Sequence, residues 1–130
     1  MLEDRIEARW IEAFKAVFER CGVAQGEHAV ILSESQSRPL NVHLAEIALD
    51  MLGARLCHVV VPTHRQTAPV PLRSTGAATV LRGQTAALAA LKSASFVADL
   101  TLEGLMHARE LGDILKSGTR VQVVSNEHPD

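Results

Sequence analysis

The chain has 130 residues, a formal net charge of −2, 47% hydrophobic residues and 3% aromatic residues, with no tyrosine. This length fits one domain spanning residues 1–130. The balanced charge and the scarcity of aromatic rings argue against a nucleic-acid partner, because such surfaces need clustered Lys and Arg and stacking rings. No apolar run reaches the roughly 20 residues of a membrane span and no signal peptide is present, so we expect a cytoplasmic protein with no membrane partner.

Residues 4–21 are predicted to form an amphipathic helix that ends before Gly22. Its apolar stripe carries three of the four aromatic residues, Trp10, Phe14 and Phe18. Such a stripe is typical of a helix that packs on its own core. Aromatic stripes also anchor partners, so the alternative is an interface helix that supports self-association.

Residues 28–33 read as a buried parallel strand because they form a short apolar run. After a polar loop, Pro39 can occupy the first position of a helix over residues 40–52, which Gly53 ends. A second strand follows over residues 54–61. Strand, helix and strand predict a right-handed crossover between parallel neighbours.

Residues 63–78 lack periodicity and contain two prolines, which predicts a long loop. A helix over 79–94, a strand over 95–100, a helix over 106–116 and a strand over 119–125 complete the order. Helical spacing places Leu115 on the sheet side, and Gly118 is expected to take a positive φ after the last helix. The order predicts an α/β fold with three layers: an open, mainly parallel sheet of about four strands with helices on both faces. The sequence does not fix the order of the strands in the sheet, for which we assume 2-1-3-4. This arrangement is Rossmann-like but lacks the glycine-rich dinucleotide fingerprint.

Two cysteines, Cys21 and Cys57, lie in apolar segments and are expected to be buried thiols in a reducing compartment. Neither belongs to a C-x-x-C pair, and the six histidines show no metal-ligand spacing. No G-x-S-x-G sequence holds a serine. We therefore assign no catalytic residue, no metal ligand and no cofactor to this chain.

Ligands of open parallel sheets bind beyond the carboxyl ends of the strands. The polar residues expected at those ends give the candidate ligand or interface positions, which are Ser33, Glu34, Ser35, Gln36, Thr63 and His64.

Several stretches are familiar once the elements are placed. They are AVILS at 29–33, VVP at 60–62, ILKSGTR at 114–120 and SNEHPD at 125–130, of which ILKSGTR with its following strand is the most specific. Together they resemble the N-terminal domain of 2,5-dihydroxypyridine 5,6-dioxygenase and of the related M29-type thermophilic metallo-aminopeptidases. The resemblance implies a longer enzyme whose C-terminal part binds Fe(II) or another divalent metal and opens a hydroxylated N-heterocycle with O2. It also implies that this chain is a non-catalytic N-terminal domain or fragment, whose partner is its missing C-terminal domain.

Three readings of function remain open at this point. The first is a domain of a dioxygenase, and the second is a domain of an aminopeptidase, a hydrolase. The third is a stand-alone α/β module for oligomerisation or for binding a small ligand at the strand ends. The residues that would decide between the two enzyme branches are not in the sequence.

Overall fold

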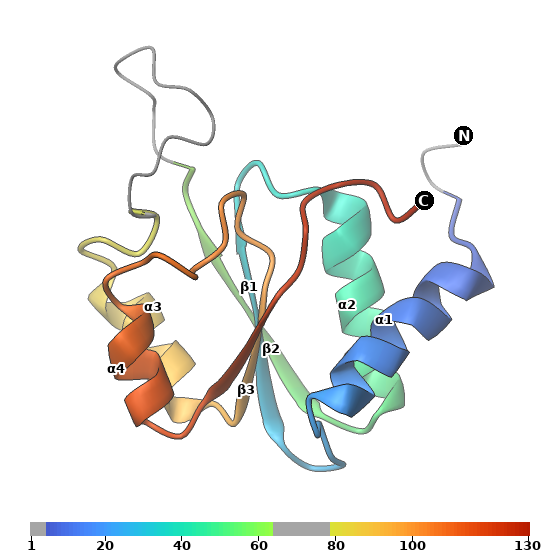
Figure 1. Cartoon of the computed structure of the whole chain (residues 1–130), viewed down its shortest axis with the longest axis horizontal. Helices are drawn as coiled ribbons and strands as arrows, with labels where there is room; N and C mark the ends of the chain where they lie inside the picture. Colours follow the sequence, from blue (N-terminus) through green and yellow to red (C-terminus); the bar gives the residue numbers. More distant parts are fainter. Residues whose placement is uncertain (1–4, 64–78) are drawn as a thin grey trace.

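The computed structural model describes residues 5–63 and 79–130, and shows a parallel sheet between two layers of helices (Figure 1). Helices α1 and α2 cover one face, and α3 and α4 cover the other (Figure 1). The elements in chain order are α1 (Ala8–Arg20), β1 (His28–Glu34), α2 (Pro39–Met51), β2 (Arg55–Val61), α3 (Thr85–Ser93), β3 (Phe96–Asp99), α4 (Leu111–Lys116) and β4 (Arg120–Val123). Within these residues no helix is long and apolar enough to cross a membrane.

The described strands form one sheet in the order β2-β1-β3-β4, with every neighbouring pair parallel. Val30 lies between Cys57 of β2 and Val97 of β3, so β1 and β3 are the inner strands. The predicted three-layer α/β fold and strand order are therefore confirmed. β2 and β4 are the two edges.

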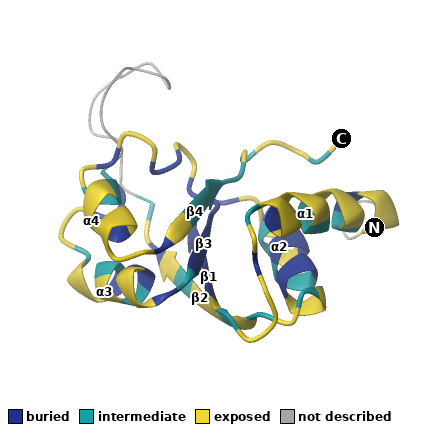
Figure 2. Cartoon of the chain, turned by 60° about the horizontal axis from the view of Figure 1, so that its bottom comes forward, coloured by how far each residue is buried: buried dark blue, intermediate teal, exposed yellow. Residues whose placement is uncertain are grey.

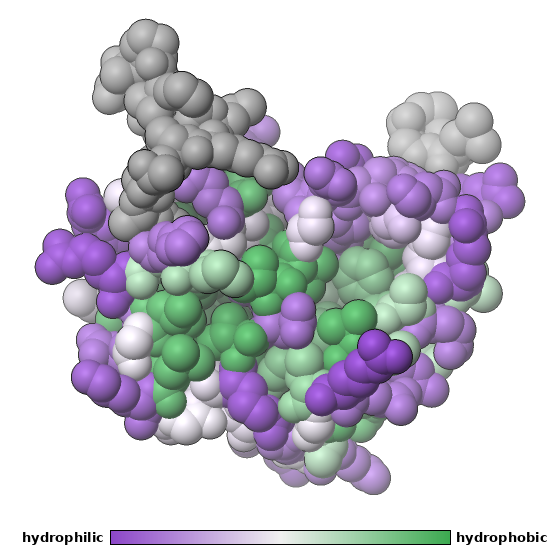
Figure 3. Space-filling view, in the orientation of Figure 1, coloured by the Kyte–Doolittle hydropathy of each residue, from purple (hydrophilic) through white to green (hydrophobic). Residues whose placement is uncertain are grey.

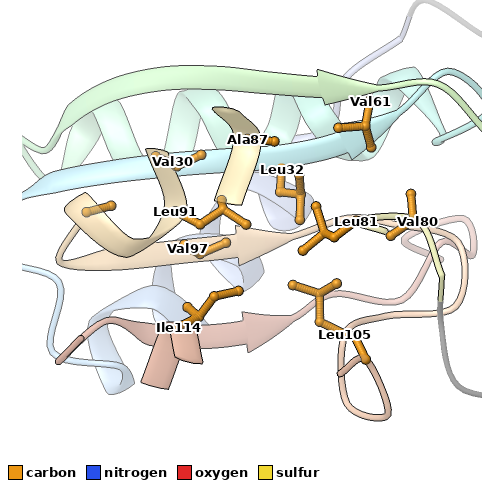
Figure 4. Packing of buried hydrophobic residues seen from close by; sticks show 12 residues of the cluster. Val30, Leu32, Val61, Val80, Leu81, Ala87, Leu91, Val97, Leu105 and Ile114 are labelled. Carbon is orange, nitrogen blue, oxygen red and sulfur yellow. The ribbon is translucent and has the colours of Figure 1, made fainter. Parts of the chain in front are cut away.

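Each face of the sheet buries an aliphatic cluster. On the α3/α4 face, Leu32, Leu91 and Ile114 are fully buried among other Val, Leu and Ala side chains (Figure 4). On the α1/α2 face, Phe18 and Phe96 meet edge to face, with ring centroids 5.6 Å apart. Figure 2 shows burial concentrated on the inner strands and on the sheet-facing sides of the helices.

Proline and glycine mark the ends of several helices. Pro39 opens α2, as the sequence predicted. Gly22 and Gly118 follow the C-caps of α1 and α4 with φ of 76° and 88°, so the predicted positive φ of Gly118 is confirmed. A residue with a Cβ pays a steric penalty in this region.

Two helices are shorter than predicted. α3 begins at Thr85 rather than 79, because residues 80–83 form a turn that ends at Gly83 with φ of 75°. α4 begins at Leu111 rather than 106, because the preceding segment is a loop. The predicted loop over 63–78 lies outside the described residues from His64 onward.

Two predictions about single side chains are wrong. Leu115 is 50% exposed, and its neighbour Ile114 is the residue of α4 that points into the core. Cys57 is exposed and Cys21 only partly buried, so the expectation of two buried thiols fails. Cys57 lies on β2, an edge strand that the helices cover incompletely, and an apolar run cannot distinguish an edge strand from an inner one.

Candidate functional site at the carboxyl edge of the sheet

The carboxyl ends of β1 and β3 form the switch point of the sheet. From β1 the chain passes through α2 to β2 on one side, and it later places β3 on the other side of β1. The connections therefore leave the two inner strands in opposite directions, which is where open α/β sheets bind ligands. Two acidic residues, Glu34 and Asp99, end these strands, and both are buried.

Asp99 is fully buried, and three donors surround its carboxylate. Oδ1 accepts hydrogen bonds from the backbone N–H of Thr101 at 3.0 Å and from its hydroxyl at 2.6 Å, and Oδ2 accepts one from the N–H of Leu105 at 2.6 Å. Burial raises the pKa of Asp99 above its usual 3.8. The hydrogen bonds from Thr101 and Leu105 oppose this rise in pKa, and the nearby Glu34 adds to it. Asp99 thus fixes the backbone of the loop that follows β3.

Glu34 makes the matching contact from β1. Its Oε2 accepts a hydrogen bond from the N–H of Leu102 at 2.7 Å. The hydroxyl of Ser37 accepts from the N–H of Glu34 and donates to the carbonyl of Leu100 at 2.7 Å. Loop 100–105 is therefore tied to both inner strands, and the switch point is closed by the chain's own polar groups.

The ends of β1 and β2 are joined by a reciprocal pair of hydrogen bonds. The N–H of Thr63 donates to the hydroxyl of Ser35, and the N–H of Gln36 donates to the hydroxyl of Thr63, each at 3.0 Å. Ser33 is buried on the α1/α2 face, whereas Ser35 and Gln36 are exposed. The structure therefore brings Glu34, Ser35, Gln36 and Thr63 to one edge. His64 lies outside the described residues.

Gly104 lets the loop approach β4 closely. Its φ is 73°, and a Cβ added there would lie 2.9 Å from Cγ1 of Val123. A side chain at this position would strain the backbone and collide with β4. Together with the Asp99 contacts, this glycine gives loop 100–105 one specific shape.

Asn41 and Trp10 hold residues 125–130, here called the strap. The buried amide of Asn41 donates through Nδ2 to the carbonyls of Ser125 and Glu127, at 3.1 and 2.8 Å, while its Oδ1 has no hydrogen-bond partner. Arg38 donates to Asn126 through its backbone N–H and its Nε. Trp10 donates to Asp130 and packs its ring edge to face with His128, with centroids 5.1 Å apart. The strap therefore covers the start of α2 and reaches α1.

The aromatic side chains of the predicted interface helix pack mostly against other parts of the same chain. Trp10 and Phe18 are 7% and 0% exposed, and Phe14 is partly buried with its ring 6.2 Å from that of Phe18. Trp10 and Phe18 are thus used internally. Phe14 and Phe18 of the stripe also line a surface groove, whereas Trp10 does not.

Sequence reasoning did not single out Asp99, Thr101 or Asn41. One signal for Asp99 was present, since it is an acidic residue at the end of an otherwise apolar strand. Asn41 gave no comparable signal, because its partners lie more than 80 positions away along the chain.

The residues do not fit a metal centre in the described part of the chain, where no group of three His, Cys, Asp or Glu side chains is arranged to hold a metal ion. The two buried carboxylates at the switch point instead accept hydrogen bonds from backbone N–H groups. We therefore derive no step of metal chemistry from them.

Comparison with known proteins gives the family. The model for 2,5-dihydroxypyridine 5,6-dioxygenase (NicX) matches residues 9–130. The chain belongs to this family. The structure of 2,5-dihydroxypyridine dioxygenase from Pseudomonas putida KT2440 superposes with a TM-score of 0.83 at 28% identity, over 96% of this chain. The match covers 36% of the dioxygenase chain, so this chain spans about a third of that protein's length. No curated protein matches the sequence.

Proposed function

We propose that this chain is the non-catalytic N-terminal domain of a 2,5-dihydroxypyridine dioxygenase-like enzyme, which opens a hydroxylated N-heterocycle using Fe(II) and O2. The family match over residues 9–130 carries this proposal. The chemistry is assigned to the part of the enzyme that corresponds to the unmatched two-thirds of the P. putida protein.

The domain's own role in this proposal is to scaffold the enzyme and to shape one wall beside the catalytic part. Loop 100–105 suits such a role, because buried Asp99 and Glu34 fix its backbone and preorganised supports keep functional surfaces rigid. The proposed partner is the catalytic part of the same enzyme rather than nucleic acid or a membrane. A cytoplasmic location belongs to the same proposal and is supported by the two free thiols.

The test is made on the protein purified from its source cells. Its intact mass is measured, and the protein is then supplied with Fe(II), O2 and 2,5-dihydroxypyridine while oxygen uptake and substrate absorbance are followed together. We expect a polypeptide well above 14 kDa and equimolar loss of substrate and oxygen. The absence of oxygen uptake with fresh Fe(II) would contradict the dioxygenase assignment.

The aminopeptidase alternative is tested on the same preparation. An aminoacyl amide would be hydrolysed without oxygen uptake if that alternative held, and hydroxypyridine would be left unchanged. We expect the opposite pattern, because the family match is to the dioxygenase.

A further inference from the structure

The edge of the sheet at β4 has unpaired backbone groups. Arg120 and Val124 donate their N–H groups inward to the carbonyls of Ser95 and Asp99. Alternate residues of a strand face opposite neighbours, so the N–H groups of Val121 and Val123 point outward, where no described residue accepts them. The carbonyl of Val123 accepts a hydrogen bond from the side-chain amide of Gln122. β4 thus presents a short, open edge.

An apolar groove runs beside this edge, on the α1 side. It has a volume of about 250 Å³ and is lined by α1 and by β4 with the two residues that follow it: Ala13, Phe14, Val17, Phe18, Gln122, Val123, Val124 and Ser125. Val17 is 39% exposed although it is apolar. Figure 3 shows apolar surface to the left and to the right of the path that β4, the dark red strand, follows in Figure 1.

The groove suits side chains of a polypeptide better than a small ligand. Small-molecule sites are usually about 300–1,000 Å³ and contain several converging polar groups. The Gln122 side chain on this wall is already engaged, with Cys21 and with the carbonyl of Val123. A strand added to β4 would form main-chain hydrogen bonds and would direct alternate side chains toward the α1 face, as in other cases of strand addition.

We propose that β4 and this groove, here called the β4 edge site, pair with an apolar strand from the remainder of a family-length chain. The proposal rests on the proposed function, because it takes its occupant from the longer enzyme. The solved relative is nearly three times as long as this chain, so a family-length chain has polypeptide outside this domain that can supply such a strand. A second copy fits less well, because β4 has four residues and stable dimers bury more than about 1,000 Å². A segment of the same polypeptide avoids the entropy cost of association.

The other edge of the sheet provides an internal comparison. Arg55 donates inward to Glu27, and the carbonyl of Val61 accepts from Ser35. The N–H groups of Leu56, His58 and Val60 therefore point outward from β2. β2 places Arg55 and His58 on its edge, and charged residues of this kind discourage pairing. Both edges should exchange amide hydrogen rapidly if neither is covered.

Hydrogen exchange on the protein purified from source cells tests the proposal. We expect the amides of Val121 and Val123 to exchange about tenfold or more slowly than those of Leu56, His58 and Val60, at every protein concentration. Equally fast exchange at both edges would overturn the proposal. Protection that appears only at high concentration would also overturn it, in favour of a second copy. The proposal would also be overturned if the protein in its source cells were no longer than the matched region.

A pair of variants controls for unfolding. Val17→Asp should lower the protection of Val121 and Val123, whereas Met51→Asp, at another exposed apolar residue that ends α2, should not. Equal protection in both variants would exclude the groove from the site. Oxygen uptake with 2,5-dihydroxypyridine is measured on the same samples. Protected β4 amides in a protein without that activity would refute the proposed function and leave the edge pairing intact.

Discussion

The hydroxyl of Thr101 donates a 2.6 Å hydrogen bond to the buried carboxylate of Asp99, two residues before it in the chain. Thr101→Val keeps the shape of this side chain and removes the donor. We expect the free energy of unfolding to fall by about 1–3 kcal/mol, because a buried carboxylate loses one of its donors. Urea unfolding measures the change. Thr101→Ser, which keeps the hydroxyl and lacks the methyl group, is the control. A loss in Thr101→Val no larger than that in Thr101→Ser would contradict a dominant role of the hydroxyl.

Asp99 also predicts a pH dependence of stability. Burial raises its folded-state pKa above 3.8. The carboxyl of Asp99 therefore binds a proton more tightly in the folded protein than in the unfolded chain. Its stabilising contribution is complete below pH 3.8 and is lost as pH rises through the folded-state pKa. Asp99→Asn does not titrate at this position. The unfolding free energy of the wild type minus that of the variant should therefore decrease from acidic to neutral pH.

The pH experiment uses urea unfolding of both proteins in parallel, so that the other titrating groups cancel in the difference. A difference that instead grows with pH would show that the three donors around Asp99 outweigh its burial. In that case the folded-state pKa is lowered rather than raised.

Substitutions of Ile114 and Leu115, which are neighbours in α4, should differ strongly in their effect on stability. Ile114 is fully buried and Leu115 is 50% exposed. Ile114→Ala should cost about 2–5 kcal/mol of unfolding free energy through the cavity that it leaves. Leu115→Ala should change stability by no more than about 0.5 kcal/mol. Thermal and urea unfolding of the two variants would reveal a reversed helix face if the order of the losses were inverted.

Asn41→Ala should loosen the strap, because it removes the two hydrogen bonds that Nδ2 donates to the carbonyls of Ser125 and Glu127. We expect a loss of about 0.5–1.5 kcal/mol and a red shift of the emission of Trp10, the single tryptophan, as the strap moves away from its ring. Fluorescence with iodide quenching measures the exposure. His43→Ala, at an exposed position of the same helix, should leave the emission unchanged. An unshifted spectrum for Asn41→Ala would mean that Trp10 and Asp130 hold the strap without it.

The sequence predicted the layers because these depend on periodicity, which is local. It did not fix the strand order, because that order depends on pairing between distant strands; the assumed order 2-1-3-4 agrees with the structure. It placed Leu115 and Cys57 wrongly for two different physical reasons. α4 has only six residues, too few turns to define a face, and the exposure of Cys57 depends on β2 being an edge strand.

The site was predictable only in part. Ser35, Gln36 and Thr63 could be placed at the strand ends from the rule for parallel sheets. The approach of Glu34 to Asp99 and the partners of Asn41 could not, because Glu34 and the strap come from distant parts of the chain. The donors to Asp99, Thr101 and Leu105, are close in sequence, but they reach the carboxylate only through the shape of loop 100–105. Their pairing exists only after the sheet has formed.

The contact of Trp10 with His128 and Asp130 has a consequence for synthesis on the ribosome. α1 emerges first, yet Phe96 and the strap, which contact its aromatic side chains, are translated more than 75 positions later. Domains generally fold as units during synthesis, so here the first helix docks fully only after residues 125–130 have been translated. We expect Trp10 to stay exposed to water in a nascent chain that is arrested before residue 125. We expect α1 to dock once the arrested chain is long enough for residue 130 to have left the exit tunnel of the ribosome.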